Sequence, residues 1–448
     1  RLSFLHDSKE AQEIFCAWLK LLPMTNPNVW NDVCQYRLED AAPVIPEQIL
    51  LFIENIYKRD KGKYLLDAFY EHVIVRILSQ LAYEPKWFER SIKILSDLPL
   101  KNNKKEVVVT FFQIAYSGTY ASIEQRLQFI QKLLHHEDGS NNRLGINCIE
   151  RMLQCKEQLR YIYRGTESFG MHQRDNGLDL TGEYKKWYLR VIEFITLEMQ
   201  NLSPEIQEQL KETLGNSLKG FGLTHSLDII EECCVKLGCN RDWWQGWISL
   251  GEIKKYYYDE FEMSEKDTLD QLISLMEPVD AVPRLACILQ GGFVGLQTYF
   301  SSQEKINEEI KRLAEIFAAN PDLLEQLFSK LGNKYFMAGD IFGRKLAESE
   351  KSDSFAALWP SICKVLDKDL SIAVGYLNVK YNCDKEKAIF LLDELENTDK
   401  ASQAVRIHSI LECSGRYLQH VLKLLSDSRI DLNCVSFLGY SIISNETK

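Results

Sequence analysis

Two glycine-containing strings come closest to a phosphate-binding loop in this sequence. Such a loop needs glycines that let backbone amides surround a phosphate, followed by Lys and then by Ser or Thr. The strings from Gly215 to Gly220 and from Gly339 to Lys345 lack both this spacing and the hydroxyl residue after the lysine. Neither string follows a predicted strand. We therefore predict no nucleotide and no other cofactor for this chain.

Three cysteines near the middle of the chain are candidates for a zinc site. Zinc sites usually contain a pair of Cys residues separated by two others, with further Cys or His ligands at a characteristic distance. Cys233 and Cys234 are adjacent, so they diverge by about 100° on a helix, and Cys239 has no His at finger spacing after it. The pattern favours thiols that pack in the core over a metal site.

Histidines provide the other candidates for chemistry. His135 and His136 lie where a predicted helix runs into the Gly-Ser-Asn-Asn string at 139–142, and a solvated helix end or a metal site could explain them. His172 lies near Arg174 in a polar stretch, where side chains that satisfy the backbone are the simpler interpretation. No Gly-x-Ser-x-Gly elbow frames a serine. We predict no catalytic residue and no metal ligand, and an all-helical enzyme with its site at these histidines is the alternative.

Helices must position these residues. Asp7 and Glu10 have the spacing of a capping box, apolar residues follow at helical spacing, and Pro23 ends the pattern. A capping serine precedes a proline at Ser203-Pro204, which marks another helix start. The Val-rich and Phe-rich stretch 106–114 lacks the alternation of a strand, so we interpret it as a buried helix.

The recurrence of these signals predicts about twenty helices joined by short connections. One helix about every 20 residues gives a hairpin repeat of about 40 residues. No tetratricopeptide or ankyrin register is consistent, so we predict an all-α, degenerate helical-hairpin superhelix of the tetratricopeptide or HEAT type. An irregular all-helical domain is the alternative. Residues 1–163 and 183–448 are expected to form the two parts of one continuous solenoid, separated by a long irregular loop at 164–182.

Composition excludes several classes of protein. The 448 residues include 53 Lys and Arg against 64 Asp and Glu, and the net charge of −11 argues against nucleic acid as a partner. No window approaches 18 consecutive apolar residues, so we predict no membrane span. The twelve cysteines are scattered singly, which favours reduced thiols in the cytoplasm. The first residue is Arg1, and we interpret the chain as a fragment of a larger protein.

Aromatic residues supply the strongest candidates for binding a protein partner. Trp243, Trp244 and Trp247 precede the run Tyr256 to Tyr258, and this cluster could lie in the core or act in part as exposed anchors, because Trp, Tyr and Arg dominate interface hot spots. The predicted partner-binding residues are chosen for their type and expected exposure. They are Arg164, Phe169, His172, Arg174, Trp244 and Tyr257.

Two stretches resemble a known family. Thr166 to Gly177, with the Arg-Asp-x-Gly loop at its end, is followed by Glu-Tyr-Lys-Lys-Trp-Tyr at 183–188. Together they resemble the Avs antiviral branch of the bacterial STAND NTPases. The rest of the chain is similar only in architecture to the C-terminal helical-repeat sensor region of that class.

The resemblance implies a function without catalysis in this chain. Family members carry an effector and an ATPase in their N-terminal part, and their sensor region recognises a phage protein such as the terminase large subunit or the portal. Recognition then drives oligomerisation of the full-length protein. We therefore expect a cytoplasmic phage sensor that is not itself an enzyme, and a generic helical-repeat scaffold for host proteins is the alternative.

Overall fold

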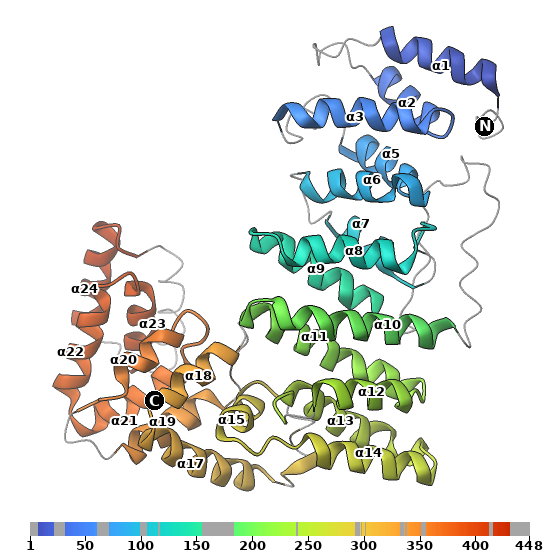
Figure 1. Ribbon diagram of the computed structural model, residues 1–448. Helices are drawn as coiled ribbons and strands as arrows, with labels where there is room; N and C mark the ends of the chain where they lie inside the picture. The colour runs from blue at the N-terminus through green and yellow to red at the C-terminus, as the bar shows by residue number, and fades with distance from the viewer. Residues whose placement is uncertain are drawn as a thin grey trace. The chain divides into compact units, whose positions relative to one another are not determined.

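The computed structural model confirms the all-α prediction (Figure 1). Its described residues form 22 α-helices and four short 3-10 helices, with no strand among them. They divide into two compact units, residues 1–233 and 234–448, and the boundary falls inside α12 (Leu227–Leu237). The loop expected at residues 164–182 lies outside the described residues, so the expected division there stays a prediction. The described residues are 8–21, 32–60, 71–98, 105–114, 117–154, 183–238, 241–291, 296, 298–300, 302–331, 336, 338–350, 355–411 and 415–430.

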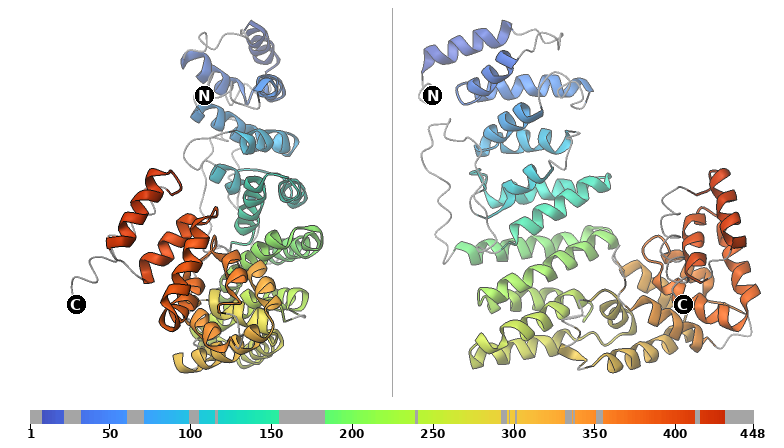
Figure 2. Two further views of the ribbon diagram at one scale, coloured as in Figure 1. Left: turned by 90° about the vertical axis from the view of Figure 1, so that its left-hand side faces the viewer. Right: turned by 180° about the vertical axis from the view of Figure 1, so that it is seen from behind.

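The first unit stacks its helices in chain order, and the views in Figure 2 show the same stacking from two other sides. Helices contact a neighbour in the chain or a helix of the next hairpin, as α8 contacts both α9 and α10. The helices are α1 (Lys9–Leu21), α2 (Asp32–Ala41), α3 (Pro46–Asp60), α5 (Glu71–Leu81), α6 (Pro85–Asp97), α7 (Lys105–Val109), α8 (Ile123–Leu134), α9 (Gly139–Met152), α10 (Glu183–Glu198) and α11 (Pro204–Leu223). The 3-10 helices are η3 (Thr110–Phe112) and η6 (Met199–Asn201).

Polar side chains link each hairpin of the first unit to the next at a nearly constant separation in sequence. The separations are 36 residues for Arg90 to Glu54, 37 for Arg76 to Glu39, 40 for Tyr57 to Asp97 and 43 for Lys132 to Glu89. Equivalent contacts in successive repeats of a solenoid recur with the repeat length. These separations agree with the predicted repeat of about 40 residues, whereas the type of repeat stays a prediction.

One longer separation locates an insertion in this pattern. Arg190 pairs with Glu124 across 66 residues, and Gln131 donates to Glu198 across 67. The intervening segment 155–182 is 28 residues long, and subtracting it leaves 38 and 39. This segment contains the predicted loop at 164–182. Without this segment, the repeat has the same length of about 40 residues as the others, so we interpret the segment as an insertion in the sequence.

A buried arginine supports the non-helical stretch before α8. Arg126 is 4% exposed and donates to the carbonyls of Gln113 and Ala121 and to the hydroxyl of Ser117. Its guanidinium lies 5.2 Å from the ring centroid of Trp187 on α10. These bonds satisfy carbonyls that no helix provides for, so Arg126 has an architectural role.

The second unit contains the remaining helices. They are α13 (Trp244–Tyr257), α14 (Met263–Met276), α15 (Ala281–Gln290), α17 (Gln303–Ala319), α18 (Asp322–Lys330), α19 (Gly339–Ser349), α20 (Trp359–Ile362), α21 (Ser371–Cys383), α22 (Lys385–Glu396), α23 (Ala401–Leu411) and α24 (Gly415–Ser426), with the 3-10 helices η7 (Tyr258–Glu260) and η8 (Cys363–Val365). Polar contacts here again span about one repeat, with 36 residues from Gln403 to Asp367 and 40 from Lys368 to Phe328.

Two glycines allow the closest helix crossing in this unit. A Cβ atom at Gly343 of α19 would lie 2.1 Å from the carbonyl oxygen of Ile372, and one at Gly375 of α21 would lie 2.1 Å from that of Asp340. No side chain fits at such distances, so α19 and α21 can meet only because both positions are glycine.

Several local predictions can be compared with the structure. Ser203 occupies the N-cap position of α11 ahead of Pro204 as predicted, although its side chain makes no capping hydrogen bond. Most of the stretch 106–114 lies in α7 and η3, with Phe111 and Phe112 fully buried. The cap of α1 is Ser8, whose hydroxyl accepts from the amide of Ala11, while Asp7 lies outside the described residues.

The helix that runs toward the string at 139–142 ends at Leu134, so the helix end expected at His135 is confirmed, whereas the string itself begins another helix. These residues form the first turn of α9, because the carboxylate of Asp138 accepts a hydrogen bond from the amide of Ser140 and caps the new helix.

Candidate functional site

The three tryptophans near the start of α13 belong to the core. Trp243, Trp244 and Trp247 are 0%, 6% and 1% exposed. The expectation that Trp244 is an exposed anchor is therefore wrong. Trp243 precedes the helix with a ψ of 68°, so it does not follow helical spacing, and all three rings can enter the interior.

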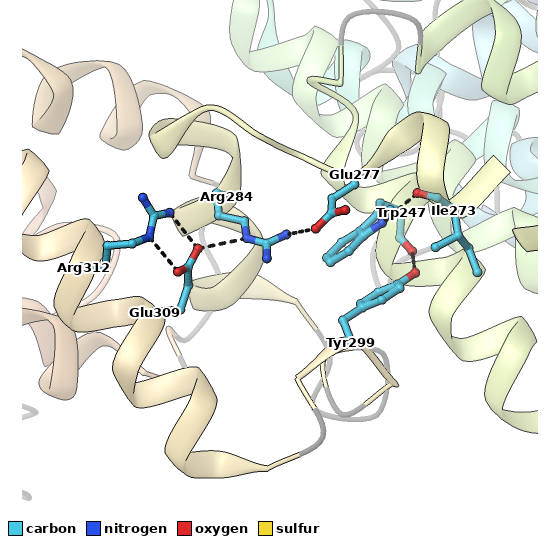
Figure 3. Close-up of polar contacts among 7 residues, drawn as sticks. All are labelled: Trp247, Ile273, Glu277, Arg284, Tyr299, Glu309 and Arg312. Carbon is cyan, nitrogen blue, oxygen red and sulfur yellow. Dashed lines mark hydrogen bonds and ion pairs between the residues drawn. The ribbon is translucent and has the colours of Figure 1, made fainter. Parts of the chain in front are cut away.

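Trp247 is fixed on several sides (Figure 3). Its indole Nε1 donates to the carbonyl of Ile273 at 3.2 Å, and the ring of Tyr299 stacks on it at a centroid distance of 3.6 Å. The Tyr299 hydroxyl also donates to the Trp247 carbonyl at 2.6 Å, and burial raises the pKa of this tyrosine well above its usual value. This geometry locks α13 against α14.

An arginine network continues from this ring toward α17. Arg284 lies 5.4 Å from the Trp247 centroid, and it pairs with Glu277 at 3.0 Å and with Glu309 at 3.2 Å. Arg312 also pairs with Glu309 at 2.8 Å. The hydrogen bond from Arg312, with help from Arg284, lowers the pKa of Glu309 below its usual value. These charges hold helices together and include no nucleophile.

The tyrosines at the other end of α13 reach the surface. Tyr256 is 51% exposed, and its ring lies 6.3 Å from that of the half-buried Tyr257. Met263, the first residue of α14, is 74% exposed. We call Tyr256, Tyr257 and Met263 the tyrosine edge. Large apolar groups exposed on an ordered helical hairpin are suited to contact with another protein.

Tyr258, the residue that follows Tyr257, is held by a hydrogen bond to a carboxylate that also forms an ion pair. The Tyr258 hydroxyl donates to Asp270 at 2.8 Å, and Lys254 pairs with the same carboxylate at 2.6 Å. The hydrogen bond to Asp270 raises the pKa of Tyr258. These contacts join the end of α13 to α14, so the tyrosine edge rests on a fixed base.

Exposed acidic residues surround the tyrosine edge. Asp259, Glu260 and Glu262 lie between the two helices and are all exposed. Apolar anchors with a polar rim are the usual anatomy of a protein interface. Lys254 and Lys255 lie in the last turn of α13, so this rim carries charges of both signs.

The other sequence-predicted residues are distributed differently. Arg164, Phe169, His172 and Arg174 lie outside the described residues, so their assignment stays a prediction. The enzyme alternative at His172 falls there too. His135 pairs with Glu198 at 2.7 Å at the end of α8, instead of helping terminal carbonyls.

One polar cluster escaped the sequence analysis. Asp393 and Glu396 on α22 lie close to His408 on α23, and their potential ligand atoms are within 4.8 Å of one another. His420 on α24 contacts the same Glu396 carboxylate. These residues come from three helices, and no ligand spacing on a single helix reveals them. This is the one group of described residues that could hold a metal ion.

The described residues define an all-α protein of stacked helical hairpins, with exposed apolar side chains at the tyrosine edge. The chain matches no family profile, no curated protein and no solved structure. In the part of the chain that the structure describes, every helix is too short or too polar to cross a bilayer.

Proposed function

We propose that this chain is a protein-recognition module and that the tyrosine edge is part of its contact surface. The exposure of Tyr256 and Met263 beside a closed tryptophan core carries this proposal. An anchor that is already ordered loses little conformational entropy on binding, so rigid aromatic side chains give affinity efficiently. No catalytic step is needed for this role.

In its more specific form, the module is the sensor of a cytoplasmic bacterial anti-phage STAND NTPase. The similarity of residues 166–177 and 183–188 to the Avs branch supports this form. The ligand would be a phage protein, with the terminase large subunit and the portal as the first candidates. Binding would trigger oligomerisation of the full-length protein.

The direct test mixes the purified chain with a purified terminase large subunit or portal protein. Size-exclusion chromatography with light scattering would show a stable complex of defined mass with one of them. Affinity capture from infected and uninfected cells extends the test to other ligands. Host proteins recovered equally from both lysates would favour the scaffold alternative, and failure with a broad panel of phage proteins would remove the immune function.

The insertion at 155–182 can be tested separately because its flanks are already joined. Trp187 Nε1 donates to the carbonyl of Met152, and the hydroxyl of Tyr188 donates to that of Gln154. A short Gly-Ser linker should therefore replace the segment without unfolding the first unit. If Arg164, Phe169, His172 and Arg174 bind the partner, this variant loses the complex but keeps its melting temperature. An unchanged complex would remove these four residues from the contact surface.

A further inference from the structure

The cluster on α22, α23 and α24 has the composition of a metal site. One oxygen of Asp393, one of Glu396 and a ring nitrogen of His408 lie within 4.8 Å of one another. Nδ1 of His408 is 3.9 Å from Oε1 of Glu396, which is too long for a hydrogen bond. Two ligands of one zinc ion are about 3.4 Å apart in a tetrahedron with bonds of about 2.1 Å. The observed spacing is close to that arrangement.

The Glu396 carboxylate is buried, and only one of its two oxygens has a hydrogen-bond partner among the described residues. Glu396 is 2% exposed and His408 is 6% exposed. Oε2 of Glu396 is in contact with Nε2 of His420. Oε1 accepts a hydrogen bond from none of the residues that the structure describes. A buried carboxylate oxygen without a donor is costly, so a cation at this position would be strongly favoured.

Glu198 in the first unit is a comparable buried glutamate whose two carboxylate oxygens both have protein partners. It too lies at a helix end and is nearly buried, with an exposed fraction of 9%. Its Oε1 accepts from Gln131 at 2.7 Å, and its Oε2 pairs with His135 at 2.7 Å. Both oxygens are therefore satisfied by protein groups. Glu396 has the histidine partner but lacks the second donor.

We propose that Asp393, Glu396 and His408 bind a divalent transition-metal ion, with zinc as the preferred ion. A nitrogen ligand beside two carboxylates disfavours magnesium and calcium, which take oxygen ligands. Among metals that accept this mixed set, zinc binds more tightly than manganese. His420 acts as a positioning residue, because it contacts Oε2 and leaves Oε1 for the ion. The ion joins α22 to α23.

The surroundings of the site suit this role. The guanidinium of Arg429 donates to the backbone carbonyl of Glu396 and fixes the end of α22. Asp393 is exposed, which gives the ion a path from solvent.

The test measures zinc affinity of the intact chain after treatment with a chelator and dialysis. Competition with a chromogenic zinc indicator should give one ion per chain at this site. Asp393→Asn should weaken binding at least tenfold, and because Asp393 is exposed the variant should keep its circular dichroism spectrum. Glu394→Gln removes a neighbouring exposed carboxylate of α22 and should leave the affinity unchanged. His420→Gln should weaken binding by about 10 to 100-fold, the usual effect of losing an outer partner.

Cobalt provides a second readout that identifies the ligand type. Cobalt at the proposed site should show visible bands of nitrogen and oxygen ligation, and these should disappear in His408→Asn and in Asp393→Asn. A thiolate charge-transfer band would place the ion on a cysteine such as the exposed Cys383 and would overturn the proposal. Zinc affinity that is undetectable, or that survives both substitutions, would overturn it as well.

Discussion

The two ends of α13 contain similar residues but have opposite environments. At its start, Trp243 and Trp247 are almost completely buried, and Trp247 is held by Tyr299 and Arg284. At its end, Tyr256 is 51% exposed, and its ring lies 6.3 Å from that of Tyr257. Aromatic residues that are close in sequence can therefore lie partly in the core and partly at the surface. The core part should govern stability, and the surface part should govern binding.

The largest expected effect is on the core side. Trp247→Ala should lower the free energy of unfolding by about 3 to 5 kcal/mol, because it removes a fully buried ring and leaves a cavity beside Tyr299. Urea denaturation followed by circular dichroism measures this change. Tyr256→Ala is the matched control from the same helix and should change stability by less than about 0.5 kcal/mol. Equal losses for the two variants would contradict the division of α13.

A smaller effect is expected from the arginine that covers the buried ring. Arg284→Met removes both the guanidinium that lies over Trp247 and the charge that faces Glu277 and Glu309. Arg312 still pairs with Glu309, so the loss should be about 1 to 3 kcal/mol. Arg344→Met removes an exposed pair with Asp340 and is the control, with no measurable loss. If Arg344→Met lowers the free energy of unfolding as much as Arg284→Met does, the burial of Arg284 does not explain the effect of its substitution.

Acid should weaken the same network. The pKa of Glu309 is lowered from its ordinary value of 4.5, first of all by the hydrogen bond from Arg312. A lowered pKa stabilises the fold above the ordinary value, and this contribution is lost as the pH falls through the folded-state value. Urea midpoints measured between pH 7 and pH 3 should therefore fall less steeply in Glu309→Gln than in the unchanged chain. Parallel curves would show that Glu309 does not contribute.

The smallest effect on stability is expected at Tyr258, which directly follows the end of α13. Tyr258→Phe removes one hydrogen bond to Asp270, which Lys254 continues to pair with. Its urea midpoint should equal that of the unchanged chain within error. A clear loss of stability would extend the core part of α13 to the base of the tyrosine edge.

Helix periodicity and capping made most of the fold predictable from the sequence. Ser203 and Pro204 mark the start of α11 correctly, because the fixed φ of proline suits the first helical turn, although the Ser203 side chain makes no capping hydrogen bond. The repeat of about 40 residues follows from helix density alone. By contrast, the low helix propensity of Gly139 to Asn142 hid the new helix that Asp138 caps there.

The sites were less predictable because they depend on tertiary placement. Trp244 was expected at the surface from its residue type, and its burial follows from how α13 packs in the second unit. Glu396, His408 and His420 lie on three successive helices, α22, α23 and α24. No local spacing can reveal a group that only helix packing brings together.

The proposed function is tested most directly by the affinity of the tyrosine edge for the partner that the binding experiments identify. Biolayer interferometry would compare the unchanged chain with Tyr256→Ala and with Trp247→Phe, a core variant that retains a buried aromatic ring. Loss of a hot-spot tyrosine costs about 2 kcal/mol, so Tyr256→Ala should bind about 30-fold more weakly at unchanged stability. Trp247→Phe should keep its affinity. An unchanged affinity in Tyr256→Ala would show that the tyrosine edge is not the contact surface.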